Sequence, residues 1–164
     1  MPTRFKRVAV AIVAAAVLTV SVSACDSSSL SGERENLARL VQGVPRPSGI
    51  VLLPCDEVDF FTTSKGKVSL LASCFSTSKG SGTGDVRGFI NDLVTAVGGS
   101  KAQAWTCQNW GVGRVICSAI VAASGDAPSG ARINVQIRSD VTPVGLPESL
   151  QGVVDIGVAV LQKK

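Results

Sequence analysis

Apolar residues between Asp85 and Gly98 recur at the spacing of an α-helix with one buried face. The i, i+3, i+4, i+7 pattern is met by Val86, Phe89, Ile90, Leu93, Val94 and Val97. Asp85 can cap the N-terminus of such a helix, and Gly98 stands where a helix commonly ends in a left-handed residue. Because only one face is apolar, we expect this helix to pack on another layer of structure.

Shorter patterns predict further elements. Residues 33–41 indicate a short helix that ends before Pro45 and Pro47, and residues 50–53 indicate a short strand. Residues 131–140 alternate apolar with polar side chains, which is typical of an antiparallel strand with one wet face.

The segment 147–162 fits two patterns. Helical spacing is met by Leu150, Val153, Val154, Val158 and Leu161, whereas Val154, Ile156, Val158 and Val160 alternate as in a strand. We expect a helix, because Pro147 and Glu148 are a favourable helix opening and Lys163 and Lys164 suit a helix C-terminus.

Two pairs of cysteines are placed as if they close hairpins. Cys107 and Cys117 lie symmetrically about Val112, and the neighbouring Gly111 and Gly113 can adopt the positive φ of a tight three-residue loop. In this register the two cysteines face each other. We therefore predict a disulfide between them, and a loop of this size stabilises by about 3 kcal/mol.

The segment around Ser64–Lys65 repeats that arrangement. Cys55 and Cys74 would face each other between hairpin arms at Val58–Thr62 and Lys67–Phe75. Of the three possible pairings of the four cysteines, the turn positions thus favour a Cys55–Cys74 disulfide beside the other one.

These elements predict an α+β fold. An antiparallel sheet of about five strands, made of two disulfide-closed hairpins and one further strand, would carry helices on one face in the order α-ββ-α-βββ-α. We expect one domain over residues 33–164. Aromatic residues are scarce, with five Phe, two Trp and no Tyr, so the core should consist mainly of aliphatic side chains.

The chain of 164 residues contains no histidine. Serine–histidine and cysteine–histidine catalysis within this chain are therefore excluded. The cysteines lack a Cys-x-x-Cys spacing, so we expect no metal site. We likewise expect no cofactor and no catalytic residue.

Three of the 16 basic residues, Arg4, Lys6 and Arg7, precede the apolar run Val8–Val22. The run is about 15 residues long, shorter than the roughly 20 of a membrane-spanning helix, and the layout is typical of a secretory signal. The remaining basic residues nearly balance the 12 acidic ones, so no nucleic-acid partner is expected.

The end of this run, Val22-Ser23-Ala24-Cys25, resembles the lipobox of bacterial lipoproteins. The resemblance implies that a diacylglycerol is attached to the sulfur of Cys25. It also implies that the signal peptide, residues 1–24, is removed by cleavage between Ala24 and Cys25. Residues 25–32 would form a lipidated end with a polar tether. An ordinary signal peptide that leaves a free thiol and a retained transmembrane anchor are the alternatives.

The two tryptophans differ in their expected roles. Strand parity places Trp105 on the same face as Cys107, where it would pack near the disulfide. Trp110 would face Arg114 at the hairpin tip, and an exposed tryptophan beside a loop is a candidate contact residue.

The sequence supports several hypotheses of function. The first is a non-enzymatic, lipid-anchored domain on the extracytoplasmic face of a bacterial cell membrane, which binds an envelope protein or a small ligand. The second is an envelope enzyme that acts on glycans through carboxylates such as Asp56 and Asp59, although with Glu57 these acids favour a solvated strand entrance. A third is an inhibitor that acts through the Trp110 hairpin.

Overall fold

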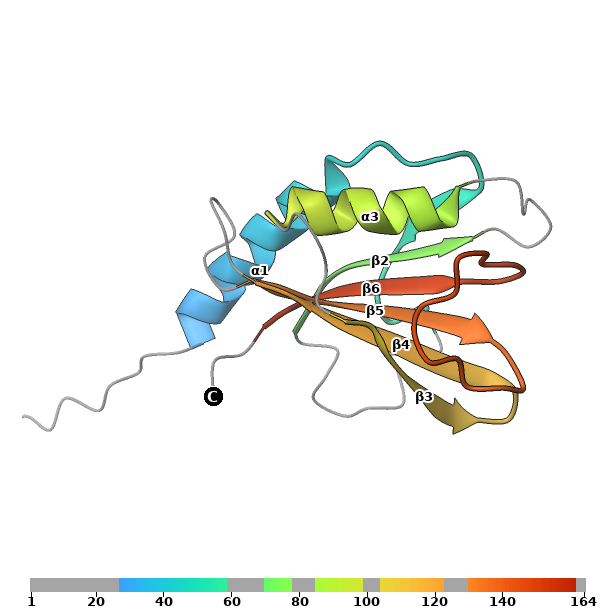
Figure 1. Ribbon diagram of the computed structural model, residues 1–164. Helices are drawn as coiled ribbons and strands as arrows, with labels where there is room; N and C mark the ends of the chain where they lie inside the picture. Colours follow the sequence, from blue (N-terminus) through green and yellow to red (C-terminus); the bar gives the residue numbers. More distant parts are fainter. Residues whose placement is uncertain (1–26, 59–69, 78–84, 99–103, 123–129, 162–164) are drawn as a thin grey trace, which may run out of the picture.

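Two helices lie against one face of a six-stranded antiparallel sheet (Figure 1). This computed structural model of the chain describes residues 27–58, 70–77, 85–98, 104–122 and 130–161. The described elements are α1 (Ser27–Gln42), β1 (Ile50–Leu53), β2 (Leu71–Thr77), α3 (Val86–Ala96), β3 (Thr106–Gly111), β4 (Arg114–Val121), β5 (Ala131–Arg138) and β6 (Asp155–Val160). The α+β class and the antiparallel sheet are confirmed, with six strands where about five were expected.

The sixth strand lies in the middle of the sheet. The strand order is β1-β2-β6-β5-β4-β3, so β6 pairs with β2 on one side and with β5 on the other. The prediction of a helix over 147–162 is therefore wrong, and Pro147 and Glu148 lie in the loop before β6. Strand alternation explains the outcome, because every second side chain is fully buried toward the helices: Val154, Ile156 and Val158.

The expected helix between Asp85 and Gly98 is confirmed as α3. The side chain of Asp85 accepts a hydrogen bond of 2.7 Å from the backbone N–H of Gly88, and Gly98 has the left-handed φ of 99°. Phe89 of α3 packs edge-on against Phe75 of β2, with ring centroids 5.2 Å apart. These contacts belong to the main core, the buried cluster between the helices and the sheet.

The first helix begins earlier than expected. α1 starts at Ser27 rather than near residue 33, within the segment 25–32 that was expected to be a tether. Its Leu37 and Val41 are buried in the main core. Gln42, the last residue of the helix, donates a hydrogen bond of 3.1 Å to the hydroxyl of Ser73 on β2. The C-terminal half of α1 is thereby held on the sheet.

The hairpin of β3 and β4 follows the register expected from its cysteines. Cys107 lies opposite Cys117, and their disulfide joins Cα atoms 4.0 Å apart. The tip differs from the expectation, because Gly111 rather than Trp110 pairs with Arg114. The loop therefore holds two residues, and Trp110 is an extra residue in β3 at a bulge. Gly111 permits this turn through its φ of 106°.

The Cys55–Cys74 disulfide is also present, but the hairpin around it differs from the prediction. β1 pairs with β2, and Leu53 lies opposite Cys74. The partner of β2 is thus the short strand over 50–53, not the expected arm Val58–Thr62, most of which lies outside the described residues. The strand ends at Leu53 because Pro54 has no N–H to donate to a ladder.

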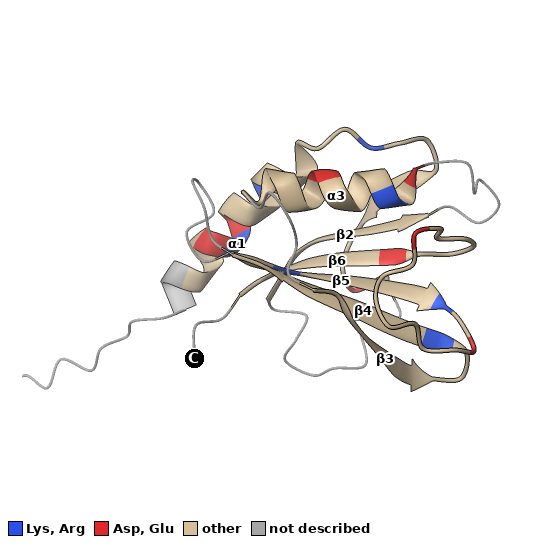
Figure 2. Ribbon diagram, in the orientation of Figure 1, with Lys and Arg blue, Asp and Glu red and all other residues tan. Residues whose placement is uncertain are grey.

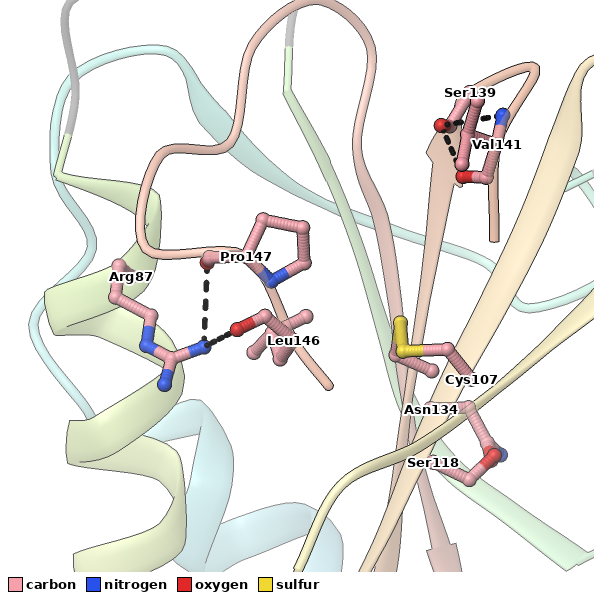
Figure 3. Close-up of a disulfide and its surroundings, with 9 residues drawn as sticks. Arg87, Cys107, Ser118, Asn134, Ser139, Val141, Leu146 and Pro147 are labelled. Carbon is pink, nitrogen blue, oxygen red and sulfur yellow. Dashed lines mark hydrogen bonds between the residues drawn. A yellow bond between two sulfur atoms is a disulfide. The ribbon is translucent and has the colours of Figure 1, made fainter. Parts of the chain in front are cut away.

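The two disulfides lie on opposite faces of the sheet. Cys117 is buried in the main core, with Cys107 packed against it (Figure 3). Cys74 points to the face that carries no helix, which we call the open face. There Cys74, Cys55 and Val58 belong to a second buried cluster. The second disulfide therefore holds a piece of chain against the open face.

The loop between β5 and β6 is held by α3 and by the β3–β4 hairpin. The guanidinium of Arg87 on α3 donates hydrogen bonds to the carbonyls of Leu146 at 3.1 Å and Pro147 at 3.4 Å (Figure 3). At the start of the loop, the backbone N–H of Ser139 donates to the carbonyl of Gly113 at 3.0 Å. The loop is thereby tied across one end of the sheet.

Candidate functional site

A row of polar side chains crosses the open face over three neighbouring strands. Ser76 of β2 lies opposite Asp155 of β6, which lies opposite Gln136 of β5. Asp155 accepts two hydrogen bonds there. Its Oδ1 accepts from the hydroxyl of Ser76 at 2.6 Å, and its Oδ2 accepts from Nε2 of Gln136 at 3.3 Å. The row is therefore fixed by the register of the sheet and by Asp155 at its centre.

Gln136 is the polar group with the least satisfied hydrogen bonding in this row. Its side chain is only 8% exposed, and its Oε1 is buried without a hydrogen-bond partner among the described residues. The amide cannot simply be turned over, because its oxygen would then face Oδ2 of Asp155, which is an acceptor. A buried acceptor of this kind costs free energy until a donor reaches it.

Two arginines lie next to this row. Arg114 of β4 and Arg138 of β5 are directly opposite each other, at the end of the sheet where Figure 2 shows basic residues on both strands. Within the described part of the chain, neither guanidinium forms an ion pair with a carboxylate. Like charges opposite each other in a sheet are destabilising. We call these two residues the arginine pair.

The arginine pair borders a depression on the open face, which we call the hollow. Its volume is about 220 Å³, and its polar lining includes the arginine pair, Gln136, Asp155 and Glu57. A second, shallower depression of about 460 Å³ lies on the other side of the arginine pair, beside Asp140. Arg114 and Arg138 thus line a depression on each side, where an anionic group could approach them.

The Cys55–Cys74 disulfide builds one wall of the hollow. Cys74 is on β2, and the bond fixes the segment directly after β1 against the open face. The backbone N–H of Glu57 donates to the carbonyl of Pro54 at 3.0 Å, which closes a turn. The next residue, Val58, is 3% exposed in the second cluster. Glu57 and Val58 then line the hollow.

Of the acidic residues singled out in the sequence, one belongs to this site. Glu57 lines the hollow, Asp56 is exposed outside it, and Asp59 lies outside the described residues. No comparable sequence pattern singles out Gln136 or Asp155. Their positions on one wet face could be expected from alternation, but their proximity depends on which strands are neighbours.

Of the two tryptophans, only Trp105 lies where strand parity places it, because Trp110 is the extra residue at the bulge. Trp105 is half-buried and packs against the main core with Cys107, as predicted. Trp110 is 43% exposed at the hairpin tip, next to the fully exposed Val112. Trp110 is therefore accessible, but it does not line the hollow.

The predicted lipidation and cleavage residues, Cys25 and Ala24, lie outside the described residues. Within the described ranges, no helix has the length and apolar character needed to cross a bilayer. The same ranges contain no cluster of three or more cysteine, aspartate or glutamate side chains that could hold a metal ion.

Comparison of the chain with protein-family models, with curated proteins and with solved structures finds no match.

Proposed function

We propose that the protein is a lipid-anchored bacterial lipoprotein whose extracytoplasmic domain binds a small polar ligand on the open face of its sheet. The observation that carries the binding function is the hollow, where the arginine pair has no carboxylate partner among the described residues and Gln136 has a buried acceptor without a donor. Both features cost stability in the absence of a ligand and are relieved when one binds.

The position of α1 supports an anchor close to the domain. The helix begins just beyond Cys25 and continues into the main core. A diacylglycerol on Cys25 would therefore hold the sheet near the membrane surface. Two acyl chains suffice for stable anchoring, whereas one gives only marginal binding.

The chemistry of the site favours binding over catalysis. The chain has no histidine, and both oxygens of Asp155 already accept hydrogen bonds from neighbouring side chains. Glu57 is the other carboxylate of the hollow, and it lies on the exposed wall. A carboxylate pair that shares acid and base roles needs one free, poised group on each side of the substrate.

Membrane fractionation tests the anchor. The full chain and its Cys25→Ala variant are expressed with their export segment in a bacterium, and each is followed in membrane and soluble fractions. We expect the unchanged chain to partition into the membrane fraction and into a detergent phase, and the variant to leave both. Intact-mass measurement should show the added mass of one diacylglycerol on the unchanged chain and not on the variant.

The Cys55→Ala/Cys74→Ala variant is the matched control, because it also loses cysteine sulfurs but keeps Cys25. It should stay with the membrane. Retention of Cys25→Ala in the membrane fraction would contradict the lipid anchor.

A further inference from the structure

We propose that the hollow binds a small zwitterion of the amino-acid type, with its carboxylate on the arginine pair and its ammonium group beside Asp155 and Glu57. This inference rests on the proposed binding function and adds the chemical class of the ligand. It follows from the distribution of charge around the hollow, from Gln136, and from the volume of the hollow.

The arginine pair fits a carboxylate. Arg114 and Arg138 occupy opposite positions on neighbouring strands, and both line the hollow. Arginine presents a planar fork of N–H donors that matches the two oxygens of a carboxylate. An anion between two adjacent guanidiniums also offsets their mutual repulsion. Among the described residues, no carboxylate forms an ion pair with either arginine that would offset it.

Acceptor groups gather elsewhere on the lining. Each oxygen of Asp155 accepts one hydrogen bond, from Ser76 or Gln136, and keeps a further lone pair for another donor. Glu57 lies on the wall that the disulfide holds in place. An ammonium group carries three donors and a positive charge, so it suits this combination of acceptors.

Gln136 links the two ends of the site. It lies beside Asp155 across the strands and precedes Arg138 on the same strand. Its Oε1 is turned away from Asp155, because Nε2 donates to that carboxylate. This oxygen can accept a hydrogen bond only, and its side chain lines the hollow. A ligand that brings a donor near its carboxylate therefore suits this position better than one that brings an acceptor.

The net charge of the lining disfavours simple anions. Two arginines are balanced by Asp155 and Glu57, so the hollow is polar but close to neutral. A phosphate dianion or a polyanion would be attracted by the arginine pair and repelled by these two carboxylates. A zwitterion places each of its charges beside the opposite one, which is the arrangement of lowest electrostatic energy.

The volume of the hollow limits the size of the ligand. At about 30 Å³ for each water of the liquid, 220 Å³ corresponds to about seven water molecules. Pockets for drug-sized ligands are larger, roughly 300–1,000 Å³. The hollow therefore matches the size of a free amino acid, and a larger ligand would extend beyond its rim.

Isothermal titration calorimetry on the lipidated protein in detergent tests the assignment. The probes are the proteinogenic amino acids, acetate and inorganic phosphate, followed by the N-acetyl and the carboxamide derivatives of the amino acid that binds most tightly. We expect at least one amino acid to bind and both derivatives to bind at least about tenfold more weakly, since each lacks one of the two charges. Arg138→Gln should weaken binding of that amino acid by about tenfold or more.

Arg132→Gln is the matched control. Arg132 lies on the same strand and on the same face as Arg138, but outside the hollow, and it should bind the amino acid like the unchanged protein. Thermal unfolding of both variants verifies that they fold, and loss of Arg138 removes repulsion within the arginine pair rather than a stabilising contact.

Three outcomes would overturn the zwitterion. An N-acetyl derivative that binds as tightly as its parent would show that the carboxylates hold no ammonium group. Binding of acetate or inorganic phosphate, without binding of any amino acid, would replace the zwitterion with a simple anion but leave the binding function standing. Absence of binding by every probe would reject both the zwitterion and the binding function, whereas the lipid anchor is decided separately by membrane fractionation.

Discussion

Removal of the Cys55–Cys74 disulfide should lower the stability of the domain and also release one wall of the hollow, whereas removal of the Cys107–Cys117 disulfide should lower the stability alone. The sequence separation of 19 between these cysteines gives a loop-closure contribution of about 3.3 kcal/mol, and the separation of 10 between Cys107 and Cys117 gives about 2.8 kcal/mol. Each pair also has one fully buried member, Cys74 or Cys117, so replacement by alanine leaves similar small voids.

We therefore expect Cys55→Ala/Cys74→Ala and Cys107→Ala/Cys117→Ala to lose similar amounts of stability, about 3 kcal/mol each. For a domain of this size that corresponds to a fall in Tm of about 10 °C. Urea unfolding of the oxidised protein and of both variants measures the free energies. A difference of more than about 2 kcal/mol between the variants would refute the loop-closure account.

The hollow should respond to only one of the two changes. Only the Cys55–Cys74 bond fixes the segment that carries Glu57 and Val58 to the open face. Limited proteolysis with an enzyme that cleaves after glutamate should cut after Glu57 faster in Cys55→Ala/Cys74→Ala than in Cys107→Ala/Cys117→Ala, because cleavage requires the buried Val58 to leave the second cluster. Equal cleavage rates in the two variants would show that the disulfide does not hold this wall.

Two further predictions concern α3 and the tryptophans. A Cβ on Gly88 would lie 2.7 Å from the carboxyl carbon of Asp85. Gly88→Ala should therefore displace the capping side chain and leave the free energy of unfolding almost unchanged, whereas in an Asp85→Ala background the same substitution should stabilise the protein by about 1 kcal/mol. Urea unfolding of the double-mutant cycle measures this coupling, and equal effects of Gly88→Ala in both backgrounds would contradict it. Acrylamide should quench fluorescence more strongly in Trp105→Phe, which retains the exposed Trp110, than in Trp110→Phe, and the reverse order would contradict the burial of the two rings.

The elements predicted well from the sequence are those whose determinants lie close together along the chain. α3 has its cap, its apolar face and its terminal glycine within one segment, and the Cys107–Cys117 register follows from the turn between the cysteines. The tip was less predictable. Whether Trp110 pairs or bulges depends on the loop length, which the glycines leave open.

The segment around β6 shows why other elements were not predictable. Its apolar residues satisfy helical and strand spacing together, and Pro147 with Glu148 suits a helix opening. The choice is made by β2 and β5, which offer hydrogen bonds on both sides and are distant in sequence. Tertiary pairing here outweighs local propensity. The same dependence hides the candidate site, because Asp155 meets Gln136 and the arginine pair only when β6 is in place.

The central place of β6 has a consequence for the order in which the domain can form. β1 and β2 are synthesised early, and β3, β4 and β5 follow, yet these two groups of strands share no ladder until β6 enters between them. Until then β2 and β5 each present an unpaired backbone edge, and exposed edges of this kind promote association between chains. The pairing of Leu71 with Ala159 also spans much of the sequence, which slows folding. A chain whose synthesis stops before β6 would therefore carry two separate groups of strands with unpaired edges rather than a smaller stable domain. We expect such a fragment to be degraded easily by proteases, in contrast to the complete domain.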